Sequence, residues 1–175
     1  MDKSVLVCVA NYVDEYEVAT CVAVMGRAGF KVVVGSIEGS MLVKASHRLN
    51  VVADALISET RDQFDAIVIT GGKRGAQRLL KSKHLQALLR AQAIEGRLIA
   101  AIGAPSTMLP PPAMLRLVDC WGAAVVSRRA GVFYADGVLT ASGPGDALDF
   151  ALKIVELLAG TDAAKNADQR MQSED

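Results

Sequence analysis

A candidate nucleophile position lies at the end of an apolar segment in the middle of the chain. Residues 98–102 have the composition of a buried strand, and residues 104–107 (Ala-Pro-Ser-Thr) can begin a helix. A strand that turns sharply into a helix is the geometry of a nucleophile elbow, where a strained backbone raises one reactive side chain above the sheet. Gly103 occupies the bend; it tolerates positive φ but supplies no nucleophile. The segment is therefore an elbow without its reactive group or a plain strand–turn–helix corner.

Glu17 is an acidic residue at the start of a predicted helix, and two interpretations of it are open. Asp14 lies three residues before it, so the pair could cap the start of a helix. Alternatively, Glu17 faces the elbow, and loss of water around its carboxyl group would then keep it protonated at neutral pH. The sequence leaves both interpretations open.

The three cysteines are odd in number and widely spaced, so they predict neither a disulfide framework nor a zinc site. Cys8 lies within an apolar strand and is expected in the core. Cys21 lies one helical turn after Glu17 and could replace a missing thiol, but a cysteine on the buried face of a helix is usually inert. Cys120 precedes Trp121 in a loop-like stretch and is the cysteine expected to be exposed.

The remaining polar candidates have plain structural explanations. Ser106 and Thr107 are expected to cap the helix after the elbow. His47 could border a site, whereas His84 lies among lysines and is expected at the surface. Residues 143–146 (Gly-Pro-Gly-Asp) predict a tight loop and a helix N-cap that could accept a small anion, without the fingerprint of a phosphate loop.

Composition limits the class of protein. The 175 residues are 51% hydrophobic and 22% charged, which is typical of one globular domain. Nineteen basic residues balance nineteen acidic ones, so charge gives no reason to expect a nucleic-acid or membrane partner. The sequence has no signal-like segment and no apolar run long enough to span a bilayer, so we expect a soluble, cytoplasmic protein.

Short apolar segments alternate with helical patterns, which predicts an α/β fold with a parallel sheet. A polar, charged tail over 161–175 is expected to be disordered, and the three prolines at 110–112 should interrupt the helix after the elbow. We expect strands at 4–10, 30–34, 65–70, 98–102, 123–126, 132–134 and 138–141, two short strands within 42–52, and helices at 14–28, 74–80, 84–94 and 146–159.

Four sequence blocks, taken together and in order, resemble one family. They are Glu17 after the first strand, residues 70–77 (Thr-Gly-Gly-Lys-Arg-Gly-Ala-Gln), residues 100–104 (Ala-Ala-Ile-Gly-Ala), and residues 140–145 (Thr-Ala-Ser-Gly-Pro-Gly) ahead of the last apolar helix. This set resembles the ThiJ/PfpI superfamily, in the branch of the human Parkinsonism-associated protein deglycase, over most of residues 3–160.

The resemblance implies a single-domain, flavodoxin-like three-layer α/β sandwich over residues 1–160, usually a homodimer and without a bound cofactor. It implies glyoxalase and deglycase activity on small dicarbonyl or glycated substrates. It also implies protection against oxidative stress and chaperone activity. It places a glutamate at Glu17 and a nucleophilic cysteine at Gly103, with the backbone N–H groups of Gly72 and Ala104 as an oxyanion hole.

The chain departs from the family pattern at the nucleophilic cysteine itself. Gly103 replaces the cysteine, the segment after the elbow is shorter than in the family, and residues 127–129 (Ser-Arg-Arg) lack the expected histidine. We therefore expect a glyoxalase- or deglycase-type protein with impaired catalysis. The alternative is a non-catalytic, dimeric chaperone-like or binding protein on the same fold. A flavin carrier is disfavoured because no phosphate-binding loop follows Ala10.

Overall fold

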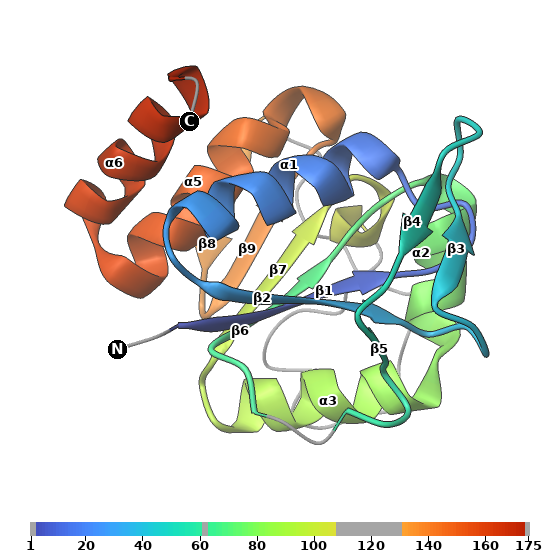
Figure 1. Cartoon of the computed structure of the whole chain (residues 1–175). Coiled ribbons are helices and arrows are strands. Elements are labelled where there is room, and N and C mark those ends of the chain that lie inside the picture. The colour runs from blue at the N-terminus through green and yellow to red at the C-terminus, as the bar shows by residue number, and fades with distance from the viewer. Residues whose placement is uncertain (1–2, 61–62, 108–130, 174–175) are drawn as a thin grey trace.

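The computed structural model of the protein describes residues 3–60, 63–107 and 131–173. A seven-stranded sheet forms its centre, in the order β5-β2-β1-β6-β7-β9-β8 (Figure 1). Every neighbouring pair in this sheet is parallel except β8 and β9. The strands are β1 (Ser4–Val9), β2 (Lys31–Ser36), β5 (Ala55–Leu56), β6 (Ala66–Ile69), β7 (Leu98–Ile102), β8 (Val132–Ala135) and β9 (Val138–Ala141).

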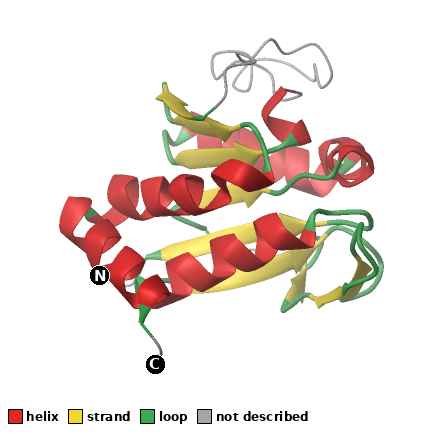
Figure 2. Ribbon diagram, turned by 90° about the horizontal axis from the view of Figure 1, so that it is seen from above, coloured by secondary structure: helices red, strands yellow, loops and turns green. Residues whose placement is uncertain are grey.

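Helices cover both faces of the sheet and lie roughly along its strands (Figures 1 and 2). The helices α1, α5 and α6 lie on one face, and α2 and α3 on the other. Their bounds are α1 (Glu15–Arg27), α2 (Lys73–Lys81), α3 (Lys83–Ile94), α5 (Ala147–Ala159) and α6 (Thr161–Gln172), with 3₁₀ turns η1 (Ala104–Thr107) and η2 (Pro144–Asp146). This arrangement confirms the predicted three-layer sandwich.

The alternation of side chains along β1 produces the two cores. Val5, Val7 and Val9 pack under α1 and α5, whereas Leu6 and Cys8 face α2 and α3. A strand buried on both faces must be apolar at every position, which is why this segment reads as a continuous hydrophobic run. Cys8 is therefore a core residue, as predicted.

A short antiparallel hairpin stands apart from the main sheet. It pairs β3 (Leu42–Lys44) with β4 (Asn50–Val52) and confirms the two short strands expected within 42–52. The short strand β5 was not predicted, because two residues give no periodic signal. The expected strand at 123–126 and the prolines at 110–112 lie outside the described residues. No helix in the described ranges has the length and apolar character needed to cross a membrane.

The structure differs from the expectation of a disordered tail, because residues 161–172 form α6. This helix packs on α1 and α5, with Ala167 only 1% exposed. Arg27 and Arg170 also donate to each other's backbone carbonyl oxygens, at 3.2 and 2.9 Å. The helix was missed because its buried face is made mainly of alanines, whose small side chains give a weak hydrophobic pattern.

The packing of α6 can be tested with a single charge. Ala167→Asp places an unpaired carboxylate in the interface and should lower the free energy of unfolding by about 2 kcal/mol. Asn166→Asp adds the same charge at the exposed neighbouring position and should change it by less than about 0.5 kcal/mol. Urea unfolding of both variants measures the difference. Equal, small effects would mean that α6 contributes no packing.

Candidate active site

The structure brings Glu17 and Gly103 together at the carboxyl ends of β6 and β7. Glu17 lies in the first turn of α1 and is 1% exposed. Its Oε2 accepts a 2.6 Å hydrogen bond from the N–H of Gly71. Its Oε1 lies 2.6 Å from the place that a Cβ atom on Gly103 would occupy. The carboxyl group therefore lies directly against the backbone of the elbow.

The backbone of Gly103 has the conformation expected of an elbow. Its φ is +70°, in the left-handed region that favours glycine. Its N–H donates to the carbonyl oxygen of Ala141 at 3.0 Å, which ties the turn to β9. Its own carbonyl oxygen accepts hydrogen bonds from the N–H of Ser106 at 3.1 Å and from the Ser106 hydroxyl at 2.7 Å. Ser106 thus closes the turn after the elbow from within η1, by donating back to Gly103, and does not act as the helix cap that the sequence predicted.

Two glycines, Gly71 and Gly103, let the carboxyl group approach this closely, because neither carries a side chain that would occupy its place. A Cβ atom on Gly71 would lie 2.5 Å from Glu17 Oε2 and 3.0 Å from the carbonyl oxygen of Ile102. Gly72 has φ +79° and lies against the backbone of Tyr12 and Val13. Gly71 was not among the predicted site residues, although its N–H is the partner of Glu17. The Gly-Gly pair after a buried strand was the available signal.

The two interpretations of Glu17 can now be separated. The Asp14 side chain caps α1 by accepting from the N–H groups of Tyr16 and Glu17, at 3.0 and 3.2 Å. In a reciprocal capping box, the Glu17 carboxyl group would accept from the N–H of Asp14. That N–H donates instead to the carbonyl oxygen of Gly71, at 3.2 Å. The capping interpretation is therefore correct for Asp14 and wrong for the carboxyl group of Glu17.

The environment of Glu17 shifts its proton affinity. Burial raises the pKa of Glu17 to about 7, and the charge of Asp14 adds to this, whereas the hydrogen bond from Gly71 lowers it. The group therefore exchanges a proton near neutral pH, which suits a general acid or base.

Neither described cysteine can serve as a substitute nucleophile. Cys8 and Cys21 are fully buried, and burial raises the pKa of both thiols. The charge of Glu17 raises the pKa of Cys21 further. A thiol held neutral in the core is a poor nucleophile. Cys120 and residues 127–129 lie outside the described residues. Most of the segment after the elbow, which is expected to be shorter than in the family, lies outside them as well.

The other predicted residues lie at separate places in the fold. Ala104 follows Gly103 directly and begins η1, and Gly72 follows Gly71 as the N-cap of α2; the role of their N–H groups as an oxyanion hole stays a prediction. His47 pairs through Nδ1 with Glu15 at 3.0 Å, at the start of α1. His84 is exposed on α3, as predicted.

The predicted N-cap at residue 146 forms without its side-chain hydrogen bond. Asp146 Oδ2 accepts instead from the N–H of Ser142, at 3.2 Å, because η2 precedes α5. Among the described residues, no group of three or more His, Cys, Asp or Glu side chains could hold a metal ion.

The raised pKa of Glu17 predicts a specific pH dependence of stability. A carboxyl group with a higher pKa in the folded chain binds more protons there, so its stabilising contribution is complete below its ordinary pKa of 4.5 and is lost as the pH rises to about 7. Glu17→Gln removes this titration. The free energy of unfolding of the natural chain, minus that of the variant, should fall by roughly 2–3 kcal/mol between pH 4.5 and 8. A difference that is constant with pH would contradict the shift.

Comparison with known proteins shows the family of the chain. The sequence model of the DJ-1/PfpI family matches residues 3–157. The chain is 35% identical to protein dj-1beta of Drosophila melanogaster over 175 residues, which cover 91% of each chain. It is 32% identical over 157 residues to the glutathione-independent glyoxalase DJR-1.2 of Caenorhabditis elegans, covering 84% of this chain and 83% of that protein.

Other relatives are longer, and solved structures share the fold. DJ-1 homolog B of Arabidopsis thaliana is 33% identical over 93% of this chain, but the chain spans only 40% of that protein. The crystal structure of Drosophila melanogaster DJ-1beta superposes with a TM-score of 0.85, 31% identity and full coverage of both chains. These matches confirm the family resemblance seen in the sequence. The chain belongs to the DJ-1/PfpI family.

Proposed function

We propose that this chain is a glyoxalase- or deglycase-type member of its family that keeps the frame of the active site but has lost thiol-dependent catalysis. The observation that carries the proposal is the placement of the Glu17 carboxyl group against the backbone of Gly103. The relative named a glutathione-independent glyoxalase supports the dicarbonyl substrate class.

The expected chemistry explains why the missing sulfur matters. A thiolate adds to the aldehyde carbon of a dicarbonyl such as methylglyoxal, and a nearby acid or base then moves protons within the adduct. Glu17 can hold such a proton near neutral pH. Gly103 forms no adduct, and the thiols of Cys8 and Cys21 are buried. The proposal therefore predicts conversion of methylglyoxal to lactate at the background rate.

Restoring the thiol provides the test. Gly103→Cys should raise lactate formation above background, whereas Gly103→Ala adds the same Cβ atom without sulfur and should not. Each side chain must adopt a positive φ, at a cost of roughly 1–2 kcal/mol, and must push the Glu17 carboxyl group aside. We therefore expect both variants to lose similar stability.

Two results of this assay would contradict the proposal. Lactate formation by the natural chain clearly above that of Gly103→Ala would mean that catalysis survives without the elbow thiol. A folded Gly103→Cys variant with only background turnover would mean that the rest of the frame is not intact.

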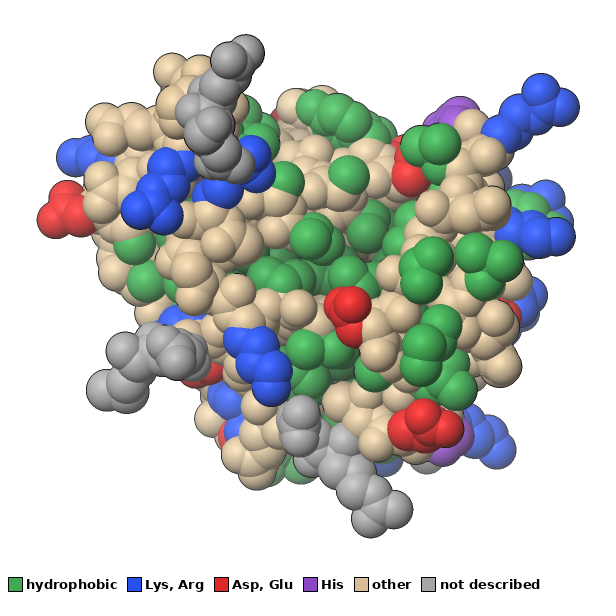
Figure 3. Space-filling view, in the orientation of Figure 1, with side chains coloured by type: hydrophobic (Ala, Val, Ile, Leu, Met, Phe, Trp, Pro, Cys, Tyr) green, Lys and Arg blue, Asp and Glu red, His purple; other side chains and the backbone are tan. Residues whose placement is uncertain are grey.

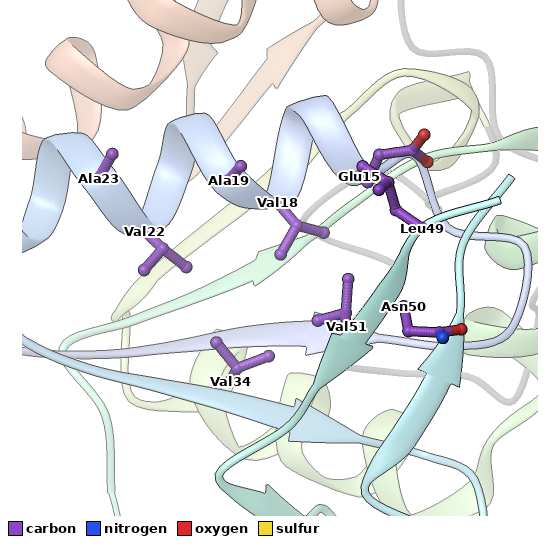
Figure 4. A pocket seen from close by; sticks show the side chains of 9 residues that line it. All are labelled: Glu15, Val18, Ala19, Val22, Ala23, Val34, Leu49, Asn50 and Val51. Atoms are coloured by element: carbon purple, nitrogen blue, oxygen red, sulfur yellow. The ribbon is translucent and has the colours of Figure 1, made fainter. Parts of the chain in front are cut away.

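We also propose that the protein is a homodimer, in which a second copy covers an apolar groove. The groove lies between α1 and the β3–β4 hairpin and has a volume of about 480 Å³ (Figures 3 and 4). Val18 and Val22 of α1 line one wall, Val34 of β2 lies across from them, and Leu49 at the rim is 59% exposed. Exposed apolar area of this kind is typical of contacts between chains, and the family resemblance implies a homodimer.

The dimer proposal predicts the effect of a charge in the groove. Leu49→Asp should shift the protein from dimer to monomer in sedimentation equilibrium, because a carboxylate in an apolar interface loses its hydration. Ile94→Asp adds the same charge at an exposed apolar residue of α3, on the opposite face of the sheet, and should leave the dimer intact. A natural chain that is monomeric at micromolar concentration would refute the proposal.

A further inference from the structure

A second pocket lies on α2, apart from Glu17 and Gly103. Arg74, Gln77, Arg78 and Lys81 line it together with Tyr12, and its volume is about 260 Å³. The four α2 residues have the spacing i, i+3, i+4, i+7, which places them on one face of the helix. Their side chains are exposed, so this stripe is not part of the core.

Specific contacts hold both guanidinium groups of the pocket in place. The Arg74 guanidinium lies over the ring of Tyr12, 3.7 Å from its centroid. Arg78 donates from Nε and Nη2 to the two carboxylate oxygens of Glu38, at 2.7 and 2.6 Å. Glu38 is itself fixed by a 2.9 Å hydrogen bond from the N–H of Asn11. The two guanidinium groups are therefore positioned before any ligand binds.

The pocket has an excess of positive charge. Glu38 neutralises Arg78, but no carboxylate among the described residues pairs with Arg74 or Lys81. No acidic residue occurs in α2, and none lines the pocket. The chain as a whole has a formal net charge of zero, so this local charge is not a consequence of a basic composition.

We propose that this pocket binds a phosphate group, either free or as a small phosphate monoester. Arginine, lysine and glutamine present N–H donors to phosphate oxygens, and Arg74 and Lys81 supply two uncompensated positive charges for a dianion. The pocket has room for a phosphate group and a few further atoms, which favours a small molecule over a polymer. The proposal does not depend on the activity proposed above, because neither Glu17 nor Gly103 lines this pocket.

Sequence inspection did not identify this pocket. Residues 74, 78 and 81 are basic and recur at helical spacing, but a pattern of this kind usually marks the solvated face of a helix. Tyr12 comes from the loop after β1, and Glu38 from the loop after β2, so only the fold brings them to α2.

Nuclear magnetic resonance titration tests the proposal directly. Inorganic phosphate and glycerol phosphate should each shift the side-chain N–H signals of Arg74 and Gln77, and glycerol should not. The double variant Arg74→Gln/Lys81→Gln should weaken binding at least tenfold, since it removes both uncompensated charges. Lys31→Gln/Lys165→Gln removes two exposed lysines outside the pocket and should bind as the natural chain does.

The titration distinguishes a phosphate monoester from free phosphate, and it distinguishes both from non-specific charge attraction. Tighter binding of glycerol phosphate than of phosphate identifies a monoester site, and equal binding identifies a site for free phosphate; both support the proposal. Equal weakening by the two double variants would mean non-specific charge attraction and would overturn it. Much tighter binding of a single-stranded oligonucleotide, with a steep salt dependence, would also overturn it.

Discussion

The structure around the elbow depends on one buried carboxyl group that shares a small space with the backbone of two glycines. Glu17 accepts a hydrogen bond from Gly71 and lies against Gly103, so any side chain at either glycine would have to displace it. Removing a carboxylate from water is costly unless it gains a proton or strong partners. A single backbone N–H compensates only in part, so the proton is retained up to about pH 7. Burial is the main cause of the raised pKa of Glu17, and the charge of Asp14 adds to it.

The same helix, α1, serves three different surfaces. Cys21 and Met25 pack into the core, Glu17 points to the ends of β6 and β7, and Val18 and Val22 line the apolar groove. A substitution on α1 therefore acts on stability, on the site or on the groove according to the face it occupies. The basic pocket lies on α2 and draws its other members from the loops after β1 and β2. Groove and basic pocket thus rest on different helices and can be altered separately.

Periodicity and apolar runs were enough to predict the parallel sheet and most of its helices. The pairing of Glu17 with Gly103 followed from the family resemblance, because nothing in local spacing brings residues 17 and 103 together. Three features were not predictable for physical reasons. The burial of α6 depends on small alanines such as Ala167, which give a weak hydrophobic pattern. The hydrogen bond from Gly71 to Glu17 depends on how two strands end side by side. The pocket of Tyr12 and Arg74 depends on tertiary contacts.

The central claim is that the Glu17 carboxyl group is held beside Gly103 in a setting that favours its protonated form. Carbon-13 magnetic resonance of the labelled side-chain carboxyl group, followed through a pH titration, measures this directly. A midpoint near pH 7 is the predicted result. A midpoint near the ordinary glutamate value of 4.5 would contradict the account, because it would mean that the carboxyl group is hydrated and does not lie against the elbow.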